Sequence, residues 1–110
     1  MTHTLTDEQR DTLKSVRRRW RTVATSLERL APRLAHKFPA HRALVATVPA
    51  LVHENRETAD LADHILKVGE CSVEQWNAFV WRVKRSADCI EATCDEAIRQ
   101  LPKPTDGAVP

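Results

Sequence analysis

Two histidines and two acids in one stretch of the chain are of the residue types that bind divalent metals. His53, Glu57, Asp60 and His64 follow one another at steps of four, three and four residues, which places them in a row on one face of a helix. Imidazole nitrogens and carboxylate oxygens are ligands of zinc and similar cations. The row lies opposite the apolar positions of the same stretch, whereas helical metal sites are normally built toward the interior. The four residues are therefore a candidate metal site, and a solvated helix face is the simpler interpretation.

Pairs of acids three residues apart suggest a catalytic function, because such pairs can hold magnesium in a hydrolase. They are Glu54 with Glu57, Asp60 with Asp63, and Asp88 with Glu91. Similar pairs occur on most exposed helices, so the pattern has low specificity. The chain has only two glycines, too few to suggest a glycine-rich phosphate loop. A metal-dependent hydrolase using the acids of residues 51–70 is the third function we consider, and we expect a non-catalytic protein without a cofactor.

Basic residues are concentrated in the first third of the chain. Residues 7–38 contain nine basic and four acidic side chains, whereas residues 51–70 contain two basic and five acidic ones. Four of the cations fall along one flank of a helix and could follow a phosphate backbone: Lys14, Arg18, Arg21 and Arg29. Alternatively, these cations face the acidic stretch. The net charge of +2 is low for a dedicated nucleic-acid binder, so RNA or DNA binding is our second function.

Trp81 lies off the apolar positions of its own segment, in the company of Arg85 and Asp88. A tryptophan on an outer helix face, next to an arginine, is typical of a contact site for a protein partner. The alternative is that the indole closes over the edge of a wide core. We interpret Trp81, Arg85 and Asp88 as the candidate partner-binding residues.

These residues must be positioned by long helices, because apolar residues recur at steps of three and four along nearly the whole chain. The first series spans residues 13–38, the second spans residues 44–65, and the third spans residues 76–101. The second series has Asn55 and Thr58 where leucine is expected, so we expect that helix to be the least completely buried. Pairing with another copy of the chain would complete its burial.

The ends of the helices have recognisable signals. Thr6 to Gln9 and Ser72 to Gln75 are capping boxes, which predict helix starts at Asp7 and just after Ser72. Phe38-Pro39 predicts the first helix end, and Gly69 predicts the second. Pro32 and Pro49 lie on the outer side of their helices and predict kinks there.

The sequence therefore predicts an all-α protein, most simply an antiparallel, up-down-up bundle of three long helices that could dimerise. Residues 1–6 are expected to be an N-terminal extension, residues 7–101 the single helical domain, and residues 102–110 a disordered tail. No segment carries a motif set that assigns the chain to a known family.

Cysteine usage and hydropathy predict the compartment. Cys71, Cys89 and Cys94 are odd in number and lack paired spacing, which favours a reducing compartment. We expect Cys94 in the core and Cys71 in a loop ahead of a helix. No apolar run approaches the length of a membrane span, and the first ten residues do not have the pattern of a secretory signal. We expect a cytoplasmic protein that acts as an interaction or assembly module and does not bind membranes.

Overall fold

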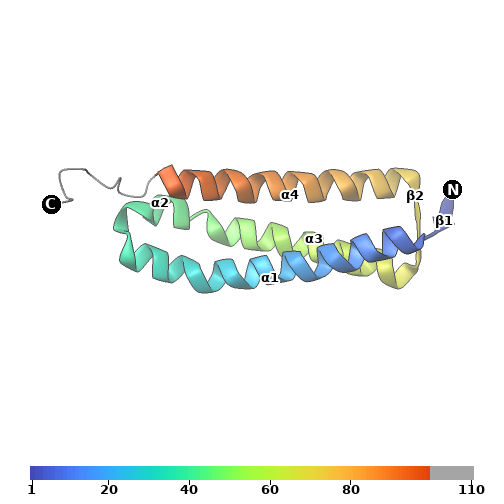
Figure 1. Cartoon of the computed structure of the whole chain (residues 1–110), viewed down its shortest axis with the longest axis horizontal. Coiled ribbons are helices and arrows are strands. Elements are labelled where there is room, and N and C mark those ends of the chain that lie inside the picture. The colour runs from blue at the N-terminus through green and yellow to red at the C-terminus, as the bar shows by residue number, and fades with distance from the viewer. Residues whose placement is uncertain (100–110) are drawn as a thin grey trace.

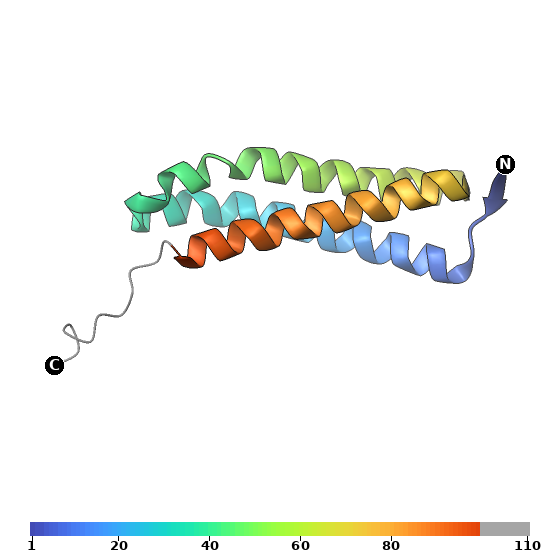
Figure 2. The same ribbon diagram turned by 90° about the horizontal axis from the view of Figure 1, so that it is seen from above.

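Three long helices lie side by side in the computed structural model, which describes residues 1–99 (Figure 1). They are α1 (Asp7–Lys37), α3 (Val48–Val68) and α4 (Val73–Arg99). The chain reverses after α1 and again after α3, so α1 and α4 run in the same direction and α3 runs in the opposite one, as the view from above also shows (Figure 2). The all-α class is confirmed. The expected tail at residues 102–110 lies outside the described residues.

Both capping boxes are present. The Thr6 hydroxyl accepts a hydrogen bond from the Gln9 amide, and the Gln9 side chain accepts one from the Thr6 amide, each at 3.0 Å. Ser72 and Gln75 repeat this exchange at 3.0 and 2.8 Å. At the end of α3, Gly69 has φ of +78°, a conformation that residues with a side chain rarely adopt. The helix ends predicted at these residues are therefore confirmed.

The segment between the first two long helices differs from the prediction of one continuous helix. A short 3-10 turn, η1 (Pro39–His41), leads into the four-residue helix α2 (Arg42–Val45), and α3 begins only at Val48. Pro49 lies in the first turn of α3, where a missing amide hydrogen breaks no helical hydrogen bond. A new helix start therefore replaces the kink predicted at Pro49, whereas α1 continues as a helix through Pro32.

The N-terminal residues form a strand, which the sequence pattern did not predict. Strand β1 (Thr2–Thr4) pairs antiparallel with β2 (Glu70–Ser72), with His3 opposite Cys71. The amide of Leu5 then donates to the carbonyl of Gly69 at 3.2 Å, and the Leu5 side chain is buried. The short sheet thus fastens the start of α1 to the link between α3 and α4.

The buried residues form two clusters of unequal composition. The larger, at the sheet end, takes residues from all three long helices and includes Leu13, Ile65 and Phe79. The smaller consists of Ala24 from α1 with Val48 and Val52 from α3, and no residue of α4 belongs to it. The distal half of α4 is therefore outside both cores.

Burial along the helices is the reverse of what the polar positions of the second series suggested. Within residues 1–99, α3 buries eight side chains, including Asn55 and Thr58, whereas α4 buries only Phe79 and Ser86. Cys94, expected in the core, is exposed. An apolar residue at helical spacing is buried only if a neighbouring helix reaches it, and spacing alone does not show this.

Cys71 is a core residue of β2 and not a loop thiol. Its burial raises the pKa of the thiol, so the thiolate is disfavoured there. In the part of the chain that the structure describes, no helix combines the length and the apolar character needed to cross a bilayer.

Candidate interaction site on helix α4

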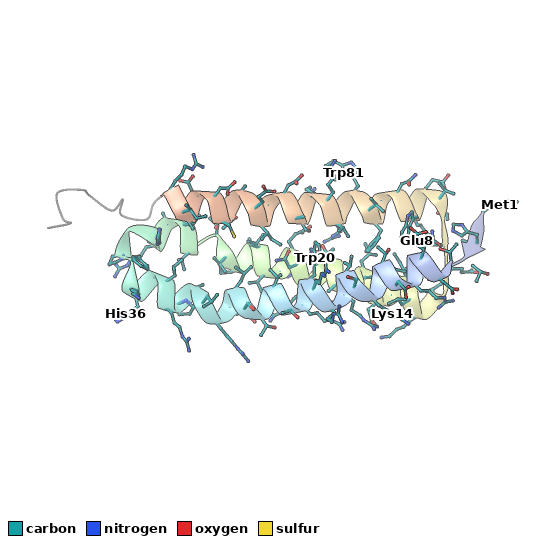
Figure 3. All side chains as sticks on the ribbon, viewed as in Figure 1. Met1, Glu8, Lys14, Trp20, His36 and Trp81 are labelled. Atoms are coloured by element: carbon teal, nitrogen blue, oxygen red, sulfur yellow. The ribbon has the colours of Figure 1, made fainter. Side chains whose placement is uncertain are left out.

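Trp81 projects from the outer face of α4, away from α1 and α3 (Figure 3). Phe79 and Ser86 are the buried side chains of this helix, and they fix the face that points inward. Trp81 follows Phe79 by two residues, about 200° around the helix, so it must point outward. Its exposed fraction is 64%, which rules out the interpretation that it closes over the edge of the core.

A cleft of about 310 Å³ lies beside Trp81, between α3 and α4. Ala78 and the indole supply apolar wall, and Glu54, Arg82 and Arg85 supply charge. An apolar anchor surrounded by ionic groups is the composition of protein contact sites, where tryptophan and arginine are enriched.

Arg82 is held firmly in this cleft. Its Nη2 lies 2.9 Å from a carboxylate oxygen of Glu57 and 3.4 Å from one of Glu54, and its Nε donates to the Thr58 hydroxyl at 3.2 Å. Three partners on α3 leave this guanidinium little freedom. Arg82 therefore joins α3 to α4 and lines the cleft.

Arg85 and Asp88 are far less constrained. Among the described residues, Arg85 has one ion pair, a long one of 3.9 Å with Glu54, and its side chain is largely exposed. Asp88 is exposed and has no ion pair within residues 1–99. Both charges can therefore turn toward a partner at little cost. The structure places Arg85 beside Trp81 in the cleft, whereas Asp88 lies two turns of helix beyond Trp81 and does not line it.

A buried polar contact lies beneath the cleft. The hydroxyls of Thr58 and Ser86 are 3.2 Å apart, and Thr58 also donates to the backbone carbonyl of Glu54 at 2.9 Å. Sequence reasoning missed the roles of Glu54, Arg82 and Ser86. Ser86 did carry a signal, because it lies between Val83 and Ile90 at a position where the helical spacing expects an apolar residue.

The four candidate metal ligands do not come together as one group in the described residues. His53 Nε2 lies 2.9 Å from Glu57, but Glu57 is shared with Arg82. Asp60 lies 3.5 Å from Arg21, and His64 lines a different hollow near Phe79. Within residues 1–99, no group of three or more histidine, cysteine, aspartate or glutamate side chains is placed to hold a metal ion.

Five basic residues of α1 bear on the predicted phosphate contact, and they form two sets. Arg17 and Arg21 face the acids of α3: Arg17 lies 2.8 Å from Asp63, and Arg21 lies 3.5 Å from Asp60. Their placement agrees with the alternative in which the cations meet the acidic stretch. The second set is exposed and has no ion pair in the described residues; it consists of Lys14, Arg18 and Arg29. Of the four cations predicted to follow a phosphate backbone, these three remain available to it.

Asp63 contacts two cations at the interface between α1 and α3. Hydrogen bonds from Lys67 at 2.9 Å and from Arg17 at 2.8 Å lower its pKa to about 2. Farther along the same pair of helices, Arg56 pairs with Glu28 in two hydrogen bonds and lowers the pKa of that carboxyl as well. These ion pairs align α1 with α3.

No protein-family model, curated protein or solved structure matches this chain.

Proposed function

We propose that this protein is a non-catalytic interaction or assembly module that binds a protein partner through Trp81, Arg85 and Asp88 of α4. The observation that carries the proposal is the exposure of Trp81 beside Arg85 at the rim of the α3–α4 cleft. Tryptophan and arginine are the residues that most often dominate binding energy at protein interfaces.

The energy available from Trp81 is large enough to anchor a complex. A tryptophan buries at least about 150 Å² in an interface, which corresponds to about 4 kcal/mol at about 25 cal/mol per Å². Part of this energy offsets the loss of freedom on association. Arg85 adds an ionic contact, since its present pair with Glu54 is long and exposed.

The proposal also includes the finer features of the architecture. The three long helices form an up-down-up bundle that bends at Pro32. This bundle associates with other proteins and with a second copy of the same chain. The protein works in the cytoplasm, where a reducing environment keeps its three cysteines as free thiols.

The test is capture of partners from cells of the organism that encodes the protein. Wild type, Trp81→Ala and Val73→Ala are each immobilised, and the bound proteins are identified by mass spectrometry. Val73 is the matched control because it is an equally exposed apolar residue at the start of α4. We expect to find a partner protein that wild type and Val73→Ala both retain. Trp81→Ala should bind this partner at least about 30-fold more weakly. Equal retention by all three variants would contradict the proposal.

A second function, binding to the phosphate backbone of RNA or DNA, is favoured by one observation: Lys14, Arg18 and Arg29 are exposed and lack ion pairs in the described residues. Because Arg21 is paired with Asp60, it is the weakest member of the predicted set. This function requires affinity for a generic oligonucleotide that falls steeply as salt rises. Absence of binding at low salt would exclude it.

A further inference from the structure

An apolar groove runs along the side of α4 opposite the Trp81 cleft, between α4 and α1. Two hollows form it. One, of about 540 Å³, is lined by Trp20 and Val23 of α1 and by Ala87 and Ile90 of α4. The other, of about 400 Å³, is lined by apolar residues that include Leu30 and Cys94. Ten of the thirteen residues that line this second hollow are apolar, and the other three are Arg33, Lys37 and Thr93.

The groove is open to solvent, since Ala87 and Cys94 of α4, which line it, are both exposed. Val80, Ala87, Cys94 and Ile98 recur at steps of seven, seven and four residues, so they share one face of α4, and all four are exposed. Across the groove, the exposed fraction of Leu30 is 56%. Lys84 and Glu91 lie on the same face between these apolar residues. A row of exposed apolar residues such as this one marks an association surface.

The charges at the two rims identify the occupant. Arg18 and Arg19 stand at the α1 rim and Glu91 at the α4 rim of the same hollow, so cations and anion lie at one height along the helices. All three are exposed and none forms an ion pair within residues 1–99. At this height the surface is therefore complementary to itself, because the two cations on α1 match the anion on α4.

We propose that a second copy of this chain covers the groove, related to the first by a two-fold axis parallel to the helices. Because α1 and α4 run in the same direction (Figure 1), this axis places α1 of each copy against α4 of the other at equal height. Arg19 of each copy then meets Glu91 of the other. An axis perpendicular to the helices would set the basic α1 against itself, which like-charge repulsion disfavours.

The face is large enough for a specific dimer interface. Its exposed apolar residues run from Val80 to Ile98, about 27 Å along the helix, and two adjacent helices are about 20 Å wide, so each copy offers about 540 Å². Two copies together bury about 1,080 Å², which is above the total of about 1,000 Å² expected of a biological interface. The inference does not depend on the Trp81 contact, which lies on the other side of α4.

Sedimentation equilibrium tests the dimer over a wide range of protein concentration. We expect wild type to reach twice its 12.5 kDa mass. In a dimer of Arg19→Glu two acids meet at each contact between residues 19 and 91, and in a dimer of Glu91→Arg two arginines meet there. Each variant should therefore raise the dissociation constant at least about tenfold. A mixture of these two variants pairs opposite charges again and should restore the dimer as a heterodimer. Arg29→Glu, the same charge change on α1 away from the groove, should leave the mass unchanged.

Leu30→Glu tests the apolar part of the interface and should give a monomer, because the carboxylate would enter the covered groove. The substituted residues are exposed, so circular dichroism should show the helical content of wild type in every variant. A wild type that stays monomeric at all concentrations overturns the inference, as does a dimer that survives both charge reversals. Trp81→Ala should leave the mass unchanged, so failure of the dimer and failure of the Trp81 contact are separate results.

Discussion

Asp63 shows how single residues align α1 with α3. Its carboxylate receives Lys67 from its own helix and Arg17 from α1, and Arg21 approaches it to 4.0 Å. The pKa of Asp63 is about 2 in the folded protein, whereas an aspartate in an unfolded chain has a pKa of about 3.9. The folded state therefore favours the charged form, and Asp63 stabilises the fold wherever it is ionised.

We predict that acid removes this contribution between about pH 4 and about pH 2. Above that window Asp63 is ionised in both states and stabilises the fold fully; as pH falls toward the folded pKa, protonation abolishes the effect. Asp63→Asn cannot titrate, so the stability gap between wild type and Asp63→Asn should be largest above about pH 4 and shrink toward pH 2. Urea unfolding followed by circular dichroism at a series of pH values measures the gap.

Asp60→Asn is the matched control, because Asp60 is an exposed neighbour whose contact with Arg21 is long, at 3.5 Å. Its removal should change the pH profile much less. A gap between wild type and Asp63→Asn that stays constant from neutral pH to about pH 2 would contradict the assignment.

Asn55, unlike Asp63, destabilises the fold. Its side chain is fully buried, and neither its amide nitrogen nor its oxygen has a hydrogen-bond partner in the described residues. Unpaired buried polar groups cost about 1 to 3 kcal/mol. Leucine has the same branching as asparagine, so Asn55→Leu should raise the free energy of unfolding by about 1 to 2 kcal/mol. Chemical denaturation measures it, and a loss of stability would show that the amide is satisfied.

At the scale of elements, the two prolines within or near long helices occupy different environments. Pro32 lies deep in α1, where it removes one helical hydrogen bond and crowds the carbonyl of Glu28. Pro49 lies in the first turn of α3, where its fixed φ suits the helix start. The same residue type should therefore have different effects on stability.

We predict that Pro32→Ala raises the free energy of unfolding by about 1 to 3 kcal/mol, because it restores the lost hydrogen bond and relieves the clash. Pro49→Ala, the matched comparison, should change it by less than about 0.5 kcal/mol or lower it slightly. Thermal and urea unfolding of the two variants provide the measurement. Equal gains from both substitutions would mean that the environments do not differ as described.

The sequence sufficed for those elements whose ends depend on local chemistry. Thr6, Ser72 and Gly69 satisfy the backbone of their own helix ends, so their residue types predicted the boundaries. It did not suffice for the pairing of β1 with β2, because that pairing joins residues about 70 positions apart and three exposed residues carry no strand pattern. The break before Val48 was missed because the apolar spacing continues across it.

Part of the candidate site could also be predicted from the sequence, and part could not. Trp81 stood out because it lies off the apolar positions of its helix, and Arg85 follows it by four residues on the same side. Glu54 and Arg82 could not be assigned, since their contact depends on how α3 and α4 align. The predicted metal ligands do not act together, because Arg21 of α1 pairs with Asp60 and Arg82 of α4 pairs with Glu57.

At the scale of the whole molecule, α1 and α3 form a well-packed pair, and α4 joins them mainly at the sheet end. Phe79 belongs to the larger core, and near the far end the ring of His41 lies 3.2 Å from the carbonyl oxygen of Ala97. Between these two contacts, Arg82 and Ser86 also join α4 to α3. The helix offers Trp81 on one side and the apolar groove on the other. The described residues leave α4 incompletely covered, and we propose that this helix functions by association.

Hydrogen exchange followed by mass spectrometry at low and high protein concentration tests this claim most directly. At low concentration, amides of residues 87–99 should exchange faster than those of residues 51–65, because α4 buries few side chains. At high concentration, exchange should slow in residues 87–99 and 18–34, which border the groove, and stay unchanged in residues 53–64. If α4 is as well protected as α3 at both concentrations, with no change between them, α4 is covered by its own chain and the account is wrong.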